Sequence, residues 1–218
     1  MFNHYVCINK IILMKKVFTL GVLAVAATLL SFKPTANNPK PSNTGNWGVD
    51  AVHSNVKFTV THLVISEVDG TFKMFDGSMT TTKEDFSDAK INFSVDVATV
   101  NTDNEMRDGH LKSDDFFNAE KFAKMNFTST SFKKVSGNKY ELKGNLTIRD
   151  VTKPVTLEVT YGGTVKDPYG NVKAGFKAKG KIKRFDYGLK WSAVTEAGGA
   201  VVGDEVEILC NIQMVKKG

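Results

Sequence analysis

Cysteine is almost absent from this sequence of 218 residues, which contains only Cys7 and Cys210. Cys7 lies in an N-terminal segment with the features of a leader, so removal of that segment leaves Cys210 alone. A single cysteine excludes an intramolecular disulfide. No cysteine follows the apolar part of the leader either, which argues against a lipoprotein anchored through a lipid on cysteine.

Sequence motifs for catalysis and metal binding are also missing. There is no HExxH, His-x-His or G-x-S-x-G segment, and these patterns are typical of zinc sites and serine hydrolases. His53 and His62 lie on or beside one predicted strand, where about 3.3 Å per residue separates them by roughly 30 Å, too far to share a metal ion. Ser113 with the nearby His110 and Asp108 fits helix caps and surface groups better than a catalytic triad. We therefore expect no enzyme activity, no metal and no catalytic cofactor.

An apolar run long enough to cross a membrane is absent too. Residues 14–36 instead have the form of a secretory signal, with two lysines, a short apolar run and small residues at its end. We predict a signal peptide over residues 1–36, with the true start at Met14, and hence a periplasmic or secreted protein. Residues 37–45 are rich in Pro, Asn and Ser and predict a flexible linker. The folded domain is expected over residues 46–218.

A large charge of one sign is absent from the predicted mature chain. The formal net charge of the whole sequence is +6, but residues 1–36 hold four of the 29 basic residues and none of the 23 acidic ones, which leaves +2. A nucleic-acid partner is therefore not expected.

The rest of the sequence is dominated by segments in which apolar and polar residues alternate. In residues 55–62, every second residue from Val56 to His62 falls on one face, which is the pattern of a half-buried antiparallel strand. Asp76-Gly77 is expected to form a turn or bulge, and residues 150–154 a tight connection. Eight strands are predicted in this way, over residues 55–62, 70–80, 89–97, 125–132, 140–148, 155–161, 176–183 and 206–214.

Eight antiparallel strands with one apolar face favour a closed sheet, because closure removes edges that template aggregation. The prediction is an all-β barrel or sandwich of about eight strands. Such a barrel is either filled by its own side chains or hollow enough for one small ligand, and alternation does not distinguish the two. Gly144, Ala178 and Gly180 lie on inward faces, and in a hollow barrel we expect the space beside them to belong to the ligand.

Residues 101–117 interrupt the strands with a helical pattern. Thr102 and Glu105 have the spacing of a capping box, which predicts a helix that starts near Asp103. Gly109 is expected to end the helix. The insert should lie over the sheet or its end and supply an apolar cover of Met106, Leu111, Phe116 and Phe117.

Three polar features have both a structural and a ligand-related interpretation. Arg107 and Asp108 are interpreted as a salt bridge or hydrogen-bond anchor that holds the insert over the barrel. His62, on an inward face, is either a core histidine bonded to nearby backbone or a polar contact for a ligand head group. The alternating lysines of residues 177–183 form either a solvated strand face or a row attracted to anionic lipid.

Several ordered motifs resemble the YceI-like family of exported bacterial polyisoprenoid-binding proteins. The resemblance implies an extended, lipocalin-like antiparallel barrel of eight strands, with the helical insert after the third strand and a long amphiphile inside, and it implies no catalytic activity. The family often has an aromatic-Pro pair where this chain has Phe122-Ala123, which loosens the turn into the next strand. The motifs are VDAVHSNVKFTVTHL (49–63), GTFKMFDG (70–77), MRDGHLKSDDFFNAEKF (106–122), GNLTIRDVTKPVTL (144–157) and KRFDYGL (183–189).

We predict a protein that binds, and carries or stores, a long-chain isoprenoid, quinone or fatty-acid-type lipid. The alternative is a filled barrel that acts as a protein-interaction or stress-response module. A transient contact with a membrane surface and a homodimer are left open. The residues expected to contact the ligand lie mostly on the inward rows and in the insert; they are Phe58, Val60, His62, Phe72, Ile91, Phe93, Val95, Met106, Leu111, Phe116, Phe117, Phe127, Leu142, Leu146, Phe176, Ala178, Ile182 and Trp191.

Overall fold

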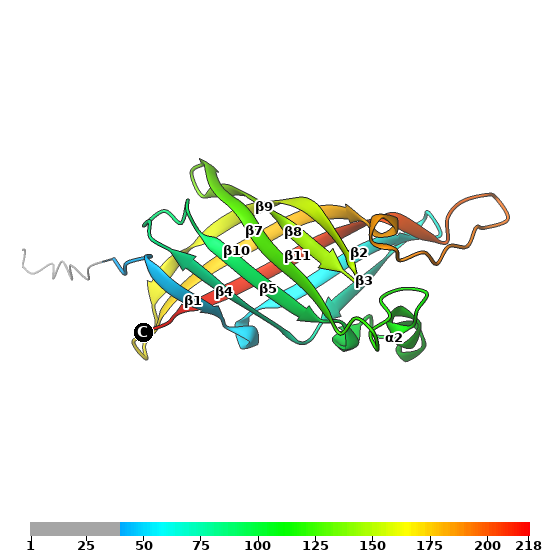
Figure 1. Cartoon of the computed structure of the whole chain (residues 1–218), viewed down its shortest axis with the longest axis horizontal. Coiled ribbons are helices and arrows are strands. Elements are labelled where there is room, and N and C mark those ends of the chain that lie inside the picture. The colour runs from blue at the N-terminus through cyan, green and yellow to red at the C-terminus, as the bar shows by residue number, and fades with distance from the viewer. Residues whose placement is uncertain (1–39) are drawn as a thin grey trace, which may run out of the picture. The chain divides into compact units, whose positions relative to one another are not determined.

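The computed structural model describes residues 40–218, so the predicted signal peptide and the first residues of the predicted linker lie outside the described part of the chain. The described chain folds mainly into long antiparallel strands (Figure 1). In chain order the elements are β1 (Gly45–Val49), η1 (Ala51–His53), β2 (Asn55–His62), β3 (Ser66–Phe72), β4 (Phe75–Thr81), β5 (Lys90–Asp96), η2 (Val97–Thr99), β6 (Val100–Asn101), α2 (Glu105–Lys112), β7 (Lys124–Ser136), β8 (Lys139–Ile148), β9 (Val151–Lys166), β10 (Val172–Lys183), η3 (Arg184–Tyr187) and β11 (Val202–Lys216).

Eight of the strands close into an antiparallel barrel. Their order around the ring is β1-β4-β5-β7-β8-β9-β10-β11, and β11 pairs back with β1, where Trp47 lies opposite Lys216. β2 continues along β11 beyond the end of β1, β3 pairs with β2, and β6 pairs with β3. The predicted all-β, eight-stranded antiparallel barrel with a short helical insert is confirmed.

The N-terminal half contains more strands than predicted. The predicted strand over residues 70–80 is two strands, β3 and β4, and β1 was not predicted. Asp76-Gly77 lies inside β4 and not in a turn, since Gly77 pairs with Phe93 on β5 and the Phe93 ring covers it. The connection expected over residues 150–154 is shorter, because Pro154 already belongs to β9. Alternation indicates which residues face inward but does not show where a strand is interrupted.

The ordered domain begins before residue 46. The backbone N–H of the buried Asn43 donates to Oε2 of Glu84 at 2.8 Å, and its side-chain amide donates to the Glu84 carbonyl oxygen at 2.6 Å. The indole N–H of Trp47 donates to the carbonyl oxygen of Asn43 at 3.0 Å. The linker predicted over residues 37–45 is therefore too long at its C-terminal end, because polar side chains that find buried partners become ordered.

The loop between β4 and β5 plugs one end of the barrel. Phe86 in this loop is fully buried, and its ring packs against Trp47, Tyr161 and Phe176 with centroid distances of 5.8, 5.4 and 5.3 Å. Asp88 stabilises the loop by accepting hydrogen bonds from two of its backbone N–H groups at 3.0 and 3.2 Å. The C-terminus lies at this same end of the barrel (Figure 1).

The helical insert lies at the opposite end, with a different cap from the one predicted. Asn104, and not Thr102, caps α2 by accepting a hydrogen bond from the Arg107 backbone N–H at 2.9 Å. The helix also continues through Gly109. Asp108 accepts hydrogen bonds from the N–H and hydroxyl of Thr102 at 2.8 and 2.6 Å, and the Arg107 guanidinium donates to the Thr102 carbonyl oxygen at 2.7 Å. Arg107 and Asp108 thus form hydrogen bonds within the insert itself, and their predicted role in holding the insert over the barrel stays a prediction.

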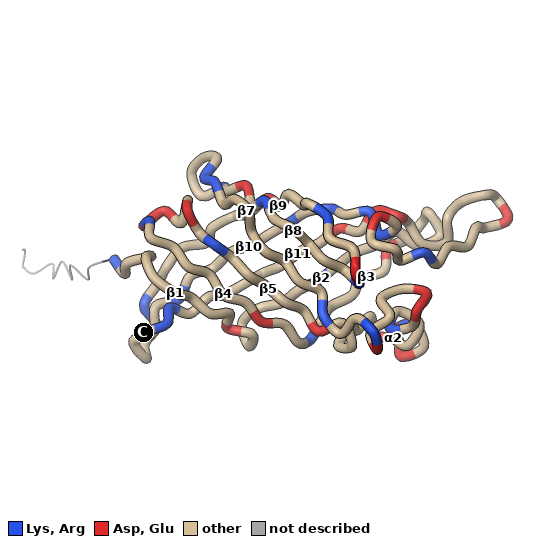
Figure 2. The backbone as a smooth tube through the Cα atoms, viewed as in Figure 1, with Lys and Arg blue, Asp and Glu red and all other residues tan. Residues whose placement is uncertain are grey.

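The lysine row on β10 faces outward and is balanced by acidic neighbours. Lys181 donates to Oε1 of Glu205 at 2.7 Å and lies opposite Glu207 in the strand register. Figure 2 shows acidic and basic residues interspersed along the chain. This arrangement favours the solvated strand face over a row that attracts anionic lipid.

Candidate ligand-binding cavity

The barrel encloses a cavity of about 250 Å³ between the plug at Phe86 and the helical insert. Inward-facing residues of the strands form its wall. On β11, Val202 and every second residue from Val206 to Met214 line the cavity, so the wall follows roughly 40 Å of this strand at about 3.3 Å per residue. The long strands thus produce an elongated interior.

The cavity wall is almost entirely apolar. Because side chains alternate along each strand, one row of each strand faces the solvent and the other row, which is mostly apolar, faces the interior. A cavity whose wall offers no polar partners does not hold well-bound water. It is suited to an apolar occupant, which would gain dispersion contacts and lose unfavourable contact with water.

Most of the residues predicted to contact a ligand line this cavity. Alternation placed them on one face of each strand, and closure of the barrel turns these faces toward a single interior. Which of them contact a bound ligand stays a prediction. The predicted residues in the wall are Phe58, Val60, Phe72, Ile91, Phe93, Val95, Leu111, Phe116, Phe117, Phe127, Leu142, Leu146, Phe176, Ala178 and Ile182.

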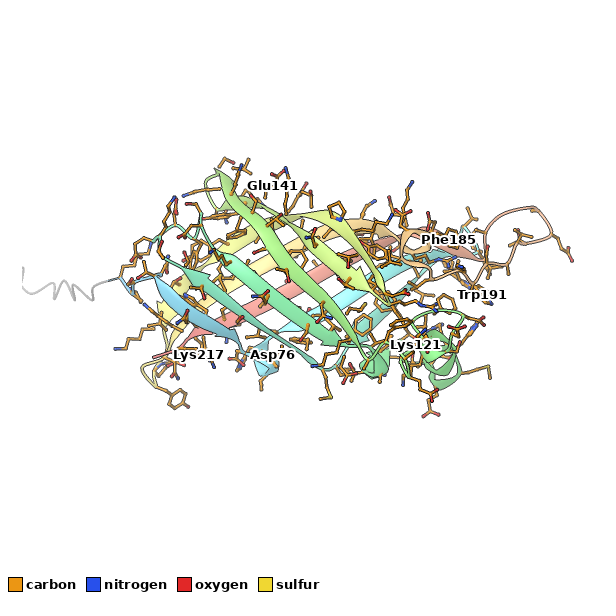
Figure 3. The ribbon with its side chains drawn as sticks, viewed as in Figure 1. Asp76, Lys121, Glu141, Phe185, Trp191 and Lys217 are labelled. Atoms are coloured by element: carbon orange, nitrogen blue, oxygen red, sulfur yellow. The ribbon has the colours of Figure 1, made fainter. Side chains whose placement is uncertain are left out.

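Three predicted residues are not part of the wall. Met106 is 86% exposed, so it does not belong to the apolar cover that was predicted for the insert. His62 lies at the end of β2, where its carbonyl oxygen accepts a hydrogen bond from the Ser66 hydroxyl at 3.1 Å. Trp191 packs against Phe116 with a centroid distance of 5.7 Å, at the barrel end next to α2 (Figure 3). Local patterns do not specify which face of a short helix or loop turns inward.

The small residues on the inward rows differ in what surrounds them. A Cβ atom at Gly144 would lie 2.5 Å from Cε2 of Phe127, and one at Gly180 would meet the side chain of Leu157. Protein atoms therefore already fill the space that was assigned to a ligand at these two glycines, and that expectation is wrong. Ala178, in contrast, lines the cavity.

Sequence reasoning missed part of the wall. Ile208, Cys210 and Ile212 line the cavity, and the alternation of their strand had already placed them on one face. Burial raises the pKa of the Cys210 thiol to about 12. Arg184 and Leu189 also reach the cavity, but they follow the end of β10 and no periodic pattern indicated them.

Arg184 holds together the chain at the insert end of the cavity. It is 3% exposed, and its guanidinium donates to the carbonyl oxygens of Leu189, Trp191, Val202 and Gly203 at 2.8, 2.7, 3.1 and 2.8 Å. Burial lowers its pKa, yet a guanidinium remains charged in proteins. Because its N–H groups donate to backbone carbonyl oxygens of both segments, Arg184 joins the segment after η3 to the start of β11.

The insert covers the end of the cavity that lies opposite Phe86. Phe116 is 6% exposed and packs edge to face against His110 with a centroid distance of 5.0 Å. His110 pairs with Asp115 through Nε2 and Oδ2 at 2.8 Å. The Arg149 guanidinium donates to the Phe116 carbonyl oxygen at 3.0 Å and so ties the turn after α2 to the β8–β9 connection. Phe116 is thereby fixed as part of both the cover and the wall.

Residues 40–218 contain no helix that is both long and apolar enough to cross a membrane. Within the same residues, no group of three or more His, Cys, Asp or Glu side chains is placed to hold a metal ion.

Comparison with known sequences gives one consistent family. A model of the YceI-like domain matches residues 47–214. Protein YceI of Salmonella newport is 41% identical over 165 residues, which cover 76% of this chain and 83% of the relative. A UPF0312 protein of Photorhabdus laumondii is 38% identical over 204 residues, which cover 94% of this chain and 100% of the relative.

Solved structures show the same architecture. A Campylobacter jejuni YCEI protein has a TM-score of 0.62 and 34% identity, with 78% of this chain and 97% of that chain covered. Two more distant structures are alike in fold alone. Burkholderia cenocepacia BcnA has a TM-score of 0.65 and 23% identity, with 76% and 98% covered. A polyisoprenoid binding domain from Saccharophagus degradans has a TM-score of 0.58 and 15% identity, with 78% and 98% covered. By sequence and by fold, the chain belongs to the YceI-like family.

Proposed function

We propose that the protein binds a long-chain isoprenoid, or a similar amphiphilic lipid, inside its barrel and carries or stores it. The observation that carries this proposal is the apolar cavity enclosed between Phe86 and the helical insert. Membership of the YceI-like family supports a lipid-binding fold, and one neighbour in fold is described as a polyisoprenoid binding domain. In this proposal the chain is a binding protein and not an enzyme.

The chemistry of the wall limits which part of the ligand lies inside. Hydrocarbon gains about 25 cal/mol for each Å² of apolar surface removed from water. A strongly polar group in the same place would lose its hydration without gaining partners, because the wall presents almost no polar atoms. We therefore place only an apolar chain in the cavity, with the polar end of a quinone, polyprenyl or fatty-acid-type lipid outside the wall.

Export to the periplasm, or secretion, is proposed from the leader-like residues 14–36. A long apolar chain is almost insoluble in an aqueous compartment. A barrel that encloses such a chain shields it from water, so an exported location and a lipid cargo fit together.

Native mass spectrometry of freshly purified protein, followed by extraction with organic solvent, tests this function. We expect a species heavier than the bare chain by one lipid, and that lipid should appear in the extract. The same sample measured after denaturation is the internal control and should give the bare mass. A bare mass after gentle purification, together with no uptake of a polyprenol from mixed micelles, would favour a filled barrel that acts as a protein-interaction or stress-response module.

A further inference from the structure

Two loops at the barrel end that carries α2 expose four apolar side chains. Leu63, Val64 and Ile65 form the turn between β2 and β3 and are 38%, 65% and 86% exposed. Val194, in the segment between η3 and β11, is 72% exposed. Both loops lie at this end, and the segment between η3 and β11 extends beyond the strands (Figure 1). These four residues are called the apolar tip.

The two loops of the apolar tip are joined to each other. The backbone N–H of Leu63 donates to the carbonyl oxygen of Val201 at 2.9 Å. Val64 lies against Gly199, where an added Cβ atom would be 3.0 Å from Cγ2 of Val64. Val194 belongs to the same loop as Gly199, in an isolated antiparallel bridge. The two loops that carry the four side chains therefore contact each other directly.

The turn in the apolar tip is unfavourable for the hairpin that contains it. Leu63 and Val64 have φ values of 52° and 66°, and the Ile65 N–H donates to the His62 carbonyl oxygen at 3.3 Å. Two successive positive φ values with this hydrogen bond are typical of a type I′ turn, whose central positions are dominated by Asn, Asp and Gly and where a β-branched residue is strained. Asn-Gly would suit both the backbone and the solvent, so the apolar pair is not explained by folding alone.

The size and charge of the apolar tip favour a bilayer as its partner. A stable protein interface buries about 800 Å² on each partner, which is much more than four projecting side chains offer, whereas insertion into lipid requires no complementary shape. The nearest charged residues along the two loops are Glu67, Lys190 and Glu196. With two acidic residues and one basic residue nearby, the tip has no preference for anionic lipid.

Residues that line the cavity lie close in sequence to the apolar tip on both loops. Val60, three residues before Leu63, and Val202, next to Val201, both line the cavity. A long-chain lipid that is almost insoluble in water has to pass between a bilayer and the barrel by direct contact. We propose that the apolar tip inserts into the surface of a lipid bilayer and marks the end of the barrel where lipid is exchanged. The proposal that lipid is exchanged at this end rests on the proposed function, whereas the proposal that the tip inserts into a bilayer does not.

Vesicle flotation tests the proposal with the double variant Leu63→Asn/Val64→Gly. This variant supplies the residues that a type I′ turn prefers, so its urea unfolding midpoint should equal or exceed that of the unchanged protein. Its partition into phosphatidylcholine vesicles should fall by about tenfold or more, which corresponds to about 1.4 kcal/mol. Val135→Asn is the matched control, because Val135 is 68% exposed but lies on β7, outside the apolar tip. This variant should leave vesicle binding unchanged.

A second variant, Ile65→Ser, leaves both positive-φ residues in place and should also reduce vesicle binding. Equal binding by the unchanged protein and both tip variants overturns the proposal. Binding that requires phosphatidylglycerol and disappears in high salt also overturns it, in favour of the lysine row on β10. A dimer that Ile65→Ser dissociates, without any vesicle binding, would assign the tip to a protein contact instead.

Native mass spectrometry of the same samples separates this inference from the proposed function. The tip variants should retain their bound lipid but transfer it to vesicles more slowly. If the unchanged protein carries no lipid and takes none up, yet binds vesicles through the tip, the proposed function fails and the membrane contact stands. If lipid is present and the tip variants transfer it at the unchanged rate, the exchange site is wrong and the proposed function stands.

Discussion

Ala178 on β10 lies opposite Cys210 on β11, and both side chains line the cavity. Two adjacent strands therefore contribute only a methyl group and a thiol to the wall at this level. The glycines on the inward rows of β8 and β10 differ, because neighbouring side chains already cover them. This contrast separates positions where the barrel is hollow from positions where it is filled.

Replacement of Ala178 by Phe should displace the lipid and leave the delipidated protein stable. The new ring enters the cavity, so the free energy of unfolding in urea should change by less than the cost of about 1–3 kcal/mol that overpacking of a filled core brings. Lipid occupancy is measured by native mass spectrometry. A destabilised Ala178→Phe variant that retains its full complement of lipid would contradict the hollow barrel.

Gly144→Leu should have the opposite effect on stability. The added side chain would collide with the Phe127 ring, so we expect a loss of about 1–3 kcal/mol or more in the free energy of unfolding. Urea unfolding of the delipidated protein measures this loss, and Ala178→Phe is measured in the same way for comparison. If Gly144→Leu is as stable as the unchanged protein, the Phe127 ring does not occupy the space assigned to it.

Phe116 and Met106 provide a matched pair within the insert. Phe116 is 6% exposed and lines the cavity, whereas Met106 is 86% exposed. Phe116→Ser should release lipid and destabilise the protein by several kcal/mol, in line with about 3–5 for Phe→Ala, while Met106→Ser should change neither property. Lipid retention after dilution and thermal unfolding are the two measurements. Equal lipid loss in both variants would show that the insert does not act through Phe116.

The thiol of Cys210 should make the protein less stable at alkaline pH. Burial raises its pKa to about 12 from an ordinary value of 9.0, so between these values the unfolded chain has released a proton that the folded chain still holds. Above pH 9.0 the free energy of unfolding should therefore fall by up to about 1.4 kcal/mol per pH unit. Below this pH the thiol is protonated in both states and causes no change with pH.

Cys210→Ala is the control for this pH dependence and should show a shallower slope. The useful window ends near pH 10, because Tyr187, whose pKa burial raises to about 12 from 10.0, then contributes in the same direction. Urea unfolding at several pH values up to 10 measures both slopes. Identical slopes would mean that the Cys210 thiol ionises equally in the folded and unfolded states.

The mature N-terminus of exported protein should lie near Asn37. Intact-mass measurement of periplasmic or secreted material, compared with cytoplasmic material from the same cells, tests this. A mature chain that still contains Lys15 and Lys16 would contradict the signal peptide.

The inward rows were predictable from the sequence because alternation is a local property. A strand repeats every two residues, so Phe58 and Val60 on β2, or Ile91 and Phe93 on β5, are assigned to one face without knowledge of the partner strand. An antiparallel barrel turns each such face inward, and this is why the fold agreed with the prediction and most of the predicted residues lie in the cavity wall. The family motifs added the ligand class as an expectation.

Only the tertiary structure determined how the cavity ends. The burial of Phe86, the exposure of Met106 and the backbone contacts of Arg184 depend on residues far away in the sequence, as does the ring that fills the space beside Gly144. Period-two alternation contains no information about such neighbours, because they are set by strand register and by how loops fold back. The sequence by itself thus determined which residues of each strand face inward, and the packing of distant segments decided how the wall is completed and how much of the interior remains hollow.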